Sequence, residues 1–263
     1  MFNYSIWQWL VFFFFYCFAG WIIESTYVSV TERRFVNRGF MRGPCLPLYG
    51  FGALTILFAC SPFRRQPWLV FLVGMVTCSM LEYLTGWLME TLFKTKYWDY
   101  SMKRFNLHGR ICLGTSLAWG GLSLAMLYLV HGPVEALIFR IPGRALFILV
   151  CCVTPVALAD FAYAFRTALS VRAVLEKLTE LKADLDLLKD QVNDTVAQTE
   201  AGYALMVRIE AINTERAELM SRMRFFARDL IRAFPTAYSQ RFNGALNEVK
   251  TRLRMRNHRG DEE

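Results

Sequence analysis

Long apolar runs, separated by short basic loops, dominate the first 165 residues of the chain. The runs cover Ile6–Val28, Leu46–Cys60, Trp68–Phe93, Ile111–Val130 and Ala145–Phe165. A helix needs about 20 consecutive apolar residues to cross the hydrocarbon core of a bilayer. The pattern therefore predicts an all-α membrane protein, with a bundle of about five transmembrane helices in a transmembrane domain over residues 1–165.

Two of these runs need a further decision. The second run is short and begins in a segment that holds Pro44, Pro47, Gly50 and Gly52. It is either a tilted span or a re-entrant segment that enters the membrane and turns back. The first run has no basic residue before it and no small-residue cleavage pattern after it. We therefore expect it to be a retained helix and not a signal peptide.

The loops between the runs differ in positive charge. The first loop carries Arg33, Arg34, Arg38 and Arg42, and the third carries Lys94, Lys96, Lys103, Arg104 and Arg110. The second and fourth loops carry two arginines each. Because cytoplasmic loops hold the excess of Lys and Arg, we predict a multi-pass protein of the cell membrane with its N-terminus outside and its C-terminus in the cytoplasm.

Residues 166–263 follow a different pattern, in which apolar positions alternate at spacings of three and four. The stripe consists of Val171, Val174, Leu178, Leu181, Leu185, Leu188 and Val192. Such an a/d stripe predicts a helical, coiled-coil-like tail, which the topology places in the cytoplasm. The stripe could pair with a second copy of the chain and form a homo-oligomer, or fold back on a later helix.

The composition agrees with a lipid bilayer as the main partner, since 55% of the residues are hydrophobic. The formal net charge of +8 could instead suggest nucleic acid. However, the part before Arg166 carries 13 Lys and Arg against 7 Asp and Glu, and the rest is nearly balanced. The excess lies in short loops and not on a basic stripe of a folded face, so we expect no nucleic-acid partner.

Several chemistries have no signature in the chain. The seven cysteines form no C-x-x-C pair and no Cys/His cluster with metal-ligand spacing, so we expect no metal and read most of them as buried small apolar residues. There is no Gly-Lys dipeptide and hence no Walker A loop, and we expect no bound cofactor. No catalytic residue is identified, and whether the protein is an enzyme stays undecided.

Four acids lie within or at the ends of the apolar runs: Glu24, Glu82, Glu90 and Asp160. An ionised side chain at the bilayer centre costs about 2.5–3.5 kcal/mol on insertion scales, so such acids usually face a partner or a water-filled cavity. The predicted topology puts all four in the cytoplasmic half. Glu82, Gly86 and Glu90 share one helix face, and Gly86 would allow another helix to approach closely.

Arginines and amides in the two basic loops are the natural partners of these acids. We therefore predict a substrate-binding site made of Glu24, Asn37, Arg38, Arg42, Glu82, Glu90, Asp99, Asn106 and Arg110. We expect the charged members Glu24, Glu82, Glu90, Arg38 and Arg110 to form one connected cluster. The alternative is that these charges are ion pairs which only staple the bundle together.

The third loop holds other polar and aromatic residues with two possible roles. His108 could transfer protons, but a solvated loop histidine is the simpler interpretation. We interpret Tyr97, Trp98 and Tyr100 as aromatics of the membrane interface and not as a stacking site.

Several motifs occur together and in order: Gly20-Trp21-Ile22-Ile23-Glu24, Asn37-Arg38-Gly39-Phe40, Gly43-Pro44, Pro47-Leu48-Tyr49-Gly50-Phe51-Gly52, Glu82-Tyr83, Trp98-Asp99-Tyr100-Ser101 and Asn106-Leu107-His108-Gly109-Arg110-Ile111-Cys112-Leu113. Over roughly residues 6–165 the chain resembles a bacterial family catalogued as ABC-transporter permeases of type IV. The resemblance implies transport, with an ATPase or another membrane protein as partner. We find no clear coupling-helix signature for such an ATPase.

Three functions follow from these observations. The first is a transporter or permease component with a polar site on the cytoplasmic side and an unknown substrate. The second is a membrane-embedded enzyme or lipid-headgroup-binding protein that uses the same acids and arginines. The third is a scaffold or sensor, in which the bundle anchors the tail.

The topology is testable by cysteine labelling in a background without reactive native cysteines. Single cysteines at Ser61 and Ser101 lie in the second and third loops, so we expect an impermeant maleimide to reach them from opposite sides of the membrane. Labelling of both positions from the same side would contradict the five-span arrangement.

Overall fold

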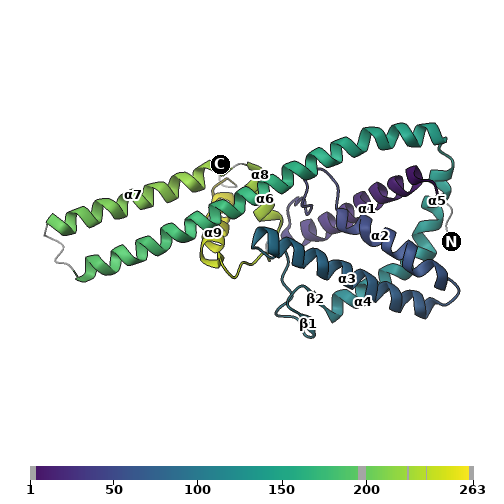
Figure 1. The fold of residues 1–263 in the computed structure, drawn as a ribbon, viewed down its shortest axis with the longest axis horizontal. Coiled ribbons are helices and arrows are strands. Elements are labelled where there is room, and N and C mark those ends of the chain that lie inside the picture. The colour runs from purple at the N-terminus through teal and green to yellow at the C-terminus, as the bar shows by residue number, and fades with distance from the viewer. Residues whose placement is uncertain (1–3, 195–199, 224, 235, 261–263) are drawn as a thin grey trace. The chain divides into compact units, whose positions relative to one another are not determined.

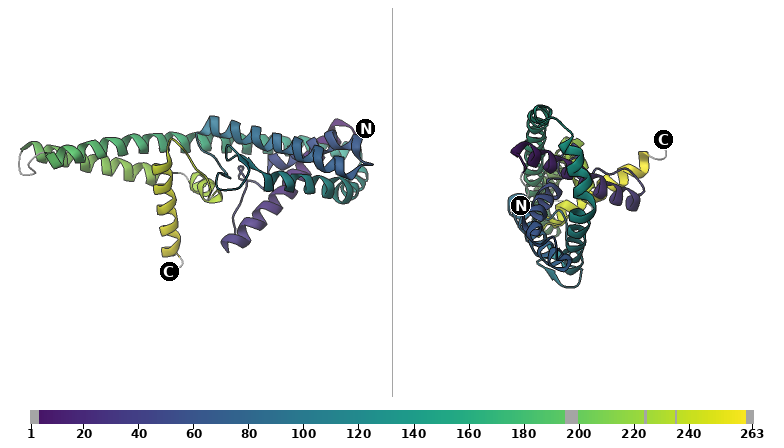
Figure 2. Two further views of the ribbon diagram at one scale, coloured as in Figure 1. Left: turned by 90° about the horizontal axis from the view of Figure 1, so that it is seen from below. Right: turned by 90° about the vertical axis from the view of Figure 1, so that its right-hand side faces the viewer.

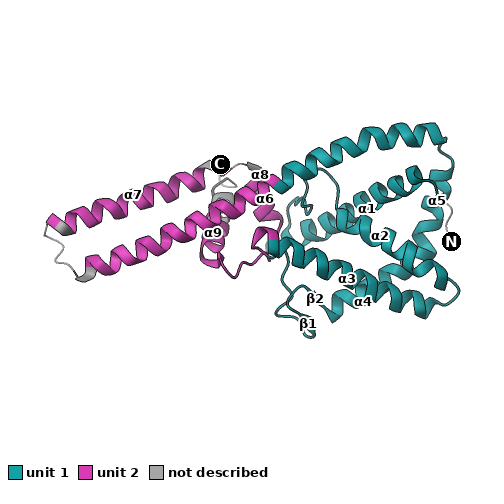
Figure 3. Ribbon diagram, viewed as in Figure 1, with its two compact units in different colours: residues 1–91, 96–165 teal, residues 92–95, 166–263 magenta. Residues whose placement is uncertain are grey.

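The computed structural model describes residues 4–194, 200–223, 225–234 and 236–260, and most of them are helical. The chain divides into two compact units (Figure 3). Unit 1 comprises Met1–Thr91 and Lys96–Phe165, and unit 2 comprises Leu92–Thr95 and Arg166–Glu263. One long helix, α6 (Gly143–Asp194), contributes to both units.

Unit 1 is a helical bundle with a small two-stranded ladder (Figure 1). Its elements are α1 (Ile6–Glu32), α2 (Pro47–Cys60), the 3-10 turn η1 (Ser61–Phe63), α3 (Pro67–Phe93), β1 (Asn106–Leu107), β2 (Ile111–Cys112), α4 (Leu113–Ala125), the π-helical turn η2 (Met126–Val130), α5 (His131–Phe139) and the first part of α6. The strands are antiparallel, with Asn106 opposite Cys112.

Local sequence explains where the first helices begin. Ser5 caps α1, because its hydroxyl accepts from the backbone N–H of Gln8 and the Gln8 side chain accepts from the backbone N–H of Ser5. Pro47 stands at the first position of α2, where a missing N–H leaves no bond unmade. Proline plays the same part at Pro67, the first residue of α3.

Within the described residues, four helical segments are long and apolar enough to cross a membrane: Ile6–Glu32, Pro67–Phe93, Leu113–Phe139 and Gly143–Val192. The prediction of an all-α membrane protein is confirmed. The faces of these helices expose large apolar side chains, which suits a lipid environment and not water. Examples are Ile23, Val76, Leu84, Leu129 and Leu158.

The shorter apolar segment Pro47–Phe63 contains α2, which packs antiparallel along α1. At one end Tyr49 lies against Gly20, and at the other the Phe58 ring stacks on Trp9 with 4.5 Å between ring centroids. These contacts place α2 along the part of α1 between Trp9 and Gly20. At 14 residues, α2 is shorter than the four segments above.

The predicted end of the fourth apolar run at Val130 is wrong, because the helix continues as α5 to Phe139. Gly132 and Pro133 suggested a loop, since proline removes one hydrogen bond and clashes with the carbonyl four residues earlier. The π-helical turn Met126–Val130 lies where that carbonyl is, and its wider winding accommodates the ring. The chain therefore stays helical through the proline.

Unit 2 contains the second part of α6, α7 (Glu200–Arg222), α8 (Phe225–Ala233) and α9 (Asn243–Gly260). Figure 2 shows α7 lying alongside α6, in agreement with Figure 1. Four residues of the apolar stripe of α6 are buried: Val171, Leu178, Leu181 and Leu185. The first part of the stripe packs in a cluster that includes Val171, Leu175, Leu178, Met223, Ile231, Phe242, Leu246 and Val249. Of the two interpretations of the stripe, folding back on later helices is therefore what the described residues adopt, and self-association stays a prediction.

This packing predicts different effects for two leucines of α6. Leu178 is 1% exposed and Leu187 is 64% exposed. Leu178→Ala should lower the free energy of unfolding by about 2–5 kcal/mol, because it leaves a cavity in the apolar cluster. Leu187→Ala should change it by about 0.5 kcal/mol or less. Denaturant unfolding of the full chain, followed by far-ultraviolet circular dichroism, would measure both changes. Equal losses of unfolding free energy would show that the stripe does not pack against other helices.

Candidate polar site in unit 1

Glu82 of α3 is the most deeply buried of the four acids, with 6% of its surface exposed. The indole Nε1–H of Trp119, on α4, donates to Glu82 Oε2 at 2.9 Å. The hydroxyl of Tyr100, in the loop after α3, lies 3.5 Å from Glu82 Oε1. Buried carboxylates need such donors, because burial removes their water. Glu82 therefore holds together two helices and a loop.

Glu24 of α1 lies in the same region and has two partners. Tyr49 of α2 donates its hydroxyl hydrogen to Glu24 Oε1 at 2.9 Å. Arg38, in the loop after α1, approaches Glu24 Oε2 with its Nε at 4.0 Å. We name these six residues the Glu82 group: Glu24, Arg38, Tyr49, Glu82, Tyr100 and Trp119.

Tyr100 reports on the electrostatics of this group. Burial raises the pKa of its hydroxyl, and the negative charges of Glu82 and Glu24 raise it further, whereas Arg38 acts in the opposite direction. Tyr100 therefore stays protonated and keeps its hydrogen for Glu82. The Glu82 and Glu24 carboxylates and the Arg38 guanidinium all lie close enough to act on this one hydroxyl.

Arg38 is a largely buried cation. Burial lowers the pKa of its guanidinium, and the nearby Glu24 carboxylate raises it. An arginine keeps its charge in proteins even so. Its backbone N–H donates to the Ser25 hydroxyl at 3.2 Å, which ties the loop to α1 just beyond Glu24.

Asn37 shapes the loop that carries Arg38. Its Oδ1 accepts from the Trp21 indole at 2.8 Å and from the Gly39 backbone N–H at 3.0 Å. Its Nδ2 donates to the carbonyl of Arg42 at 2.7 Å. With every one of these bonds inside the loop or to α1, Asn37 is a positioning residue for Arg38.

Asp160 of α6 also holds this loop. Its carboxylate accepts from the backbone N–H groups of Arg42 at 3.3 Å and Gly43 at 2.8 Å. The Arg42 guanidinium lies 5.1 Å from the centroid of the Tyr163 ring, a cation–π distance. Asp160 and Arg42 thus join the loop to α6.

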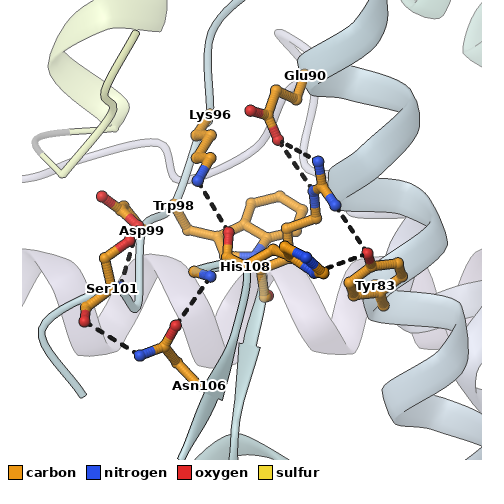
Figure 4. A network of polar contacts seen from close by, with 10 residues as sticks. Tyr83, Glu90, Lys96, Trp98, Asp99, Ser101, Asn106 and His108 are labelled. Carbon is orange, nitrogen blue, oxygen red and sulfur yellow. Dashed lines mark hydrogen bonds and ion pairs between the residues drawn. The ribbon is translucent and has the colours of Figure 1, made fainter. Parts of the chain in front are cut away.

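A second set of polar residues, the Glu90 group, surrounds the guanidinium of Arg110 (Figure 4). Arg110 donates to Glu90 Oε2 from Nε at 2.9 Å and approaches it from Nη2 at 2.8 Å. Its Nη1 donates to the Tyr83 hydroxyl at 2.8 Å, and that hydroxyl also lies 3.1 Å from His108 Nδ1. Glu90, Arg110, Tyr83 and His108 therefore form one hydrogen-bonded network.

Asp99 and Asn106 build the loop beneath this network (Figure 4). Asp99 Oδ1 accepts from both the backbone N–H and the hydroxyl of Ser101, and Asn106 Nδ2 donates to the carbonyls of Ser101 and Lys103. Asn106 Oδ1 accepts from Gly109, whose φ of 69° favours glycine. The hydrogen bonds of Asp99 and Asn106 thus fix the conformation of the loop.

Among the contacts described above, the five charged residues expected in one cluster fall into two groups. Glu24, Arg38 and Glu82 belong to the Glu82 group, whereas Glu90 and Arg110 belong to the Glu90 group. The neighbours Glu82 and Tyr83 contribute to different groups, because successive helical residues point about 100° apart. Gly86 lies against the loop side chains of Trp98 and Arg110, and not against another helix as expected.

The sequence interpretation missed several members of these groups. Tyr100 and Tyr97 were expected at the membrane interface, but Tyr100 contacts Glu82 and Tyr97 is buried. Trp98 donates its indole hydrogen to the carbonyl of Arg110. Tyr49 and Trp119 were not identified at all, although Tyr49 stands in one of the quoted motifs. No local pattern marks Trp119.

The described residues contain no group of three or more His, Cys, Asp and Glu side chains that could hold a metal ion. A protein family described as "Putative ABC-transporter type IV" matches residues 11–165. The chain belongs to this family. Both polar groups lie inside the matched segment, and the tail lies outside it. No curated protein and no solved structure matches the chain.

Membership confirms the resemblance seen in the sequence, and the apolar helices fit a multi-pass membrane protein. The family description states neither a substrate nor a partner. What the membrane domain of this ABC-transporter family member binds has to be argued from the geometry of its polar groups.

Gly20 tests how tightly the Glu82 group is built. A Cβ at this position would overlap the Tyr49 ring, which would have to move away from Glu24. We expect Gly20→Ala to lower stability by about 1–3 kcal/mol through overpacking. A Cβ at Gly121 of α4 would meet nothing within 4 Å, so Gly121→Ala is the matched control. The melting temperatures of the two purified variants give the comparison, and equal values would contradict the close packing of Tyr49.

Proposed function

We propose that this protein is the membrane-embedded permease component of a transporter, and that the Glu82 group binds the polar part of the substrate from the cytoplasmic side. The observation that carries the proposal is the surroundings of Glu82. In the described part of the chain its two hydrogen-bond partners, Trp119 and Tyr100, are both neutral. Its negative charge is stabilised by donors and not by a direct ion pair.

Glu90 provides the contrast within the same helix. It is bound by two nitrogens of the Arg110 guanidinium, so its charge is directly compensated. A pair of this kind has a structural role, and it fits the interpretation in which ion pairs staple the bundle. We therefore assign the structural role to Glu90 and Arg110 and the binding role to Glu82.

Energetics favour a function for Glu82. A carboxylate in a membrane-spanning helix is costly, and ionisable residues there mark substrate or ion pathways. Neutral donors hold the carboxylate in place but leave it suited to a cationic or hydrogen-bond-donating group of a substrate. Arg38, beside Glu24, suits an anionic group. The group therefore fits a zwitterionic or organic-cation substrate.

We infer the partners from the kind of transporter that the family description names. The chain holds no nucleotide-binding motif, so an ATPase or another membrane protein would supply the energy for transport. The predicted topology puts the loops that carry Arg38 and Tyr100 on the cytoplasmic side, where such a partner would bind. The lipid bilayer is the remaining partner.

The proposal is tested by ligand-induced thermal shifts of purified protein with a panel of organic cations and zwitterions. We expect at least one compound to raise the melting temperature of the wild type. Glu82→Gln should weaken its binding roughly 10- to 100-fold, the loss expected when a charge-assisted hydrogen bond of about 1.5–3 kcal/mol is removed. Glu32→Gln, at the exposed end of α1, is the control and should bind normally.

Stability separates the two acids in the same experiment. Without ligand, Glu90→Gln should melt at a lower temperature than Glu82→Gln, because it deprives Arg110 of its counter-charge. If Glu82→Gln bound every active compound as the wild type does, the binding role of Glu82 would be wrong. If no variant affected binding, the site would lie elsewhere.

A further inference from the structure

A third polar cluster of unit 1 lies where the start of α1 meets α5. His131 of α5 is 2% exposed and is flanked by two tyrosines. The Tyr16 hydroxyl lies 3.0 Å from His131 Nδ1, and the Tyr4 hydroxyl lies 2.9 Å from Nε2. Tyr4 also donates to Glu135 Oε1 at 2.6 Å. We name these four residues the His131 chain.

The hydrogens in this chain have a definite direction. The single hydroxyl hydrogen of Tyr4 is given to Glu135, so Tyr4 can only accept from His131. Nε2 of His131 must therefore carry a hydrogen. A neutral imidazole has one N–H, so Nδ1 accepts from the Tyr16 hydroxyl. Hydrogen bonds then run in one direction, from Tyr16 through His131 and Tyr4 to Glu135.

The backbone around His131 directs its side chain towards Tyr4 and Tyr16. The π-helical turn Met126–Val130 ends immediately before His131, and such turns are frequent at functional sites. His131 and Glu135 are four residues apart and so lie on one face of α5. That face meets Tyr4 and Tyr16, and apolar side chains such as Phe12 and Val134 enclose it.

Two charged groups of the described residues act on His131: Glu135 on α5 and Arg64, after η1. Burial raises the pKa of the Tyr4 hydroxyl, the Glu135 carboxylate raises it further, and Arg64 lowers it. Tyr4 therefore keeps its hydrogen and remains the bridge between the imidazole and the carboxylate.

We propose that the His131 chain is a proton-binding site of this membrane domain. One proton from water adds to Nδ1 of the neutral imidazole and gives the imidazolium. Nδ1–H then donates to the Tyr16 oxygen, whose own hydrogen turns away, while Nε2–H still donates to Tyr4. The Glu135 carboxylate balances the new positive charge through Tyr4. No bond between heavy atoms forms or breaks.

The site is separate from the Glu82 group, so the proposal does not rest on the proposed function. Tyr16 and Glu24 both lie on α1, with Glu24 two helical turns further along. The only hydrogen bond that must reverse on protonation is that of Tyr16. Protonation at this end of the bundle would thus act directly on the helix that carries Glu24.

The test is a nuclear magnetic resonance titration of the full-length protein in detergent, labelled with 15N-histidine. The chain has three histidines, and the signal of His131 is the one lost in His131→Gln. We expect its ring nitrogens to change from the neutral to the protonated pattern between about pH 4 and pH 9. In Glu135→Gln the midpoint should fall by about one pH unit or more, because the balancing carboxylate is gone.

A pair of neighbouring arginines supplies a matched control. Arg64→Gln should raise the midpoint, because it removes a facing positive charge, whereas Arg65→Gln should leave it unchanged. Both residues are exposed, so both variants should fold. They therefore decide the test even if Glu135→Gln does not fold. A ring that stays neutral over the whole range would overturn the proposal, as would midpoints that are the same in all folded variants.

Discussion

Carboxylates in apolar helices are the constraint on which the architecture of unit 1 depends. A membrane-spanning helix with a glutamate is stable only if other elements bring donors or counter-charges to it. Glu82 meets this demand through Trp119 of α4 and Tyr100 of the following loop. Glu24 meets it through Tyr49 of α2 and Arg38. The acids therefore determine which helices and loops come together at this end of the bundle.

The same demand is met in three chemically different ways. Glu90 has a direct ion pair with Arg110, which compensates its charge. Glu82 has neutral donors, and Glu135 has a tyrosine that links it to a buried histidine. These differences give the groups different capacities. A compensated acid stabilises the fold, a hydrogen-bonded but unneutralised acid can bind a cationic group, and an acid joined to an imidazole can balance a proton.

The loops of unit 1 also contribute to the polar groups, because they carry the arginines that contact the acids. The segments after α1 and α3 are held by amide and carboxylate side chains, such as Asn37 and Asn106, that hydrogen-bond to the backbone. Irregular backbone near a membrane has to satisfy its polar groups within the protein. Asp160 performs this for the backbone around Gly43. The loops can then carry Arg38 and Arg110 to the acids in fixed positions.

The apolar runs and the heptad spacing by themselves determined the membrane helices and the helical tail, because hydrophobic length and period are local properties. The four acids could also be picked out, since a charge within an apolar run is visible in one segment. Their partners could not. Glu82 and Glu90 lie on one helix face, and only the packing of α4 and the loop gave one a tryptophan and the other an arginine. The fourth apolar run was expected to end at Val130, just before His131, yet the π-helical turn keeps the helix intact through Pro133. Partner choice depends on contacts between residues far apart in the chain, and only the tertiary structure decides those.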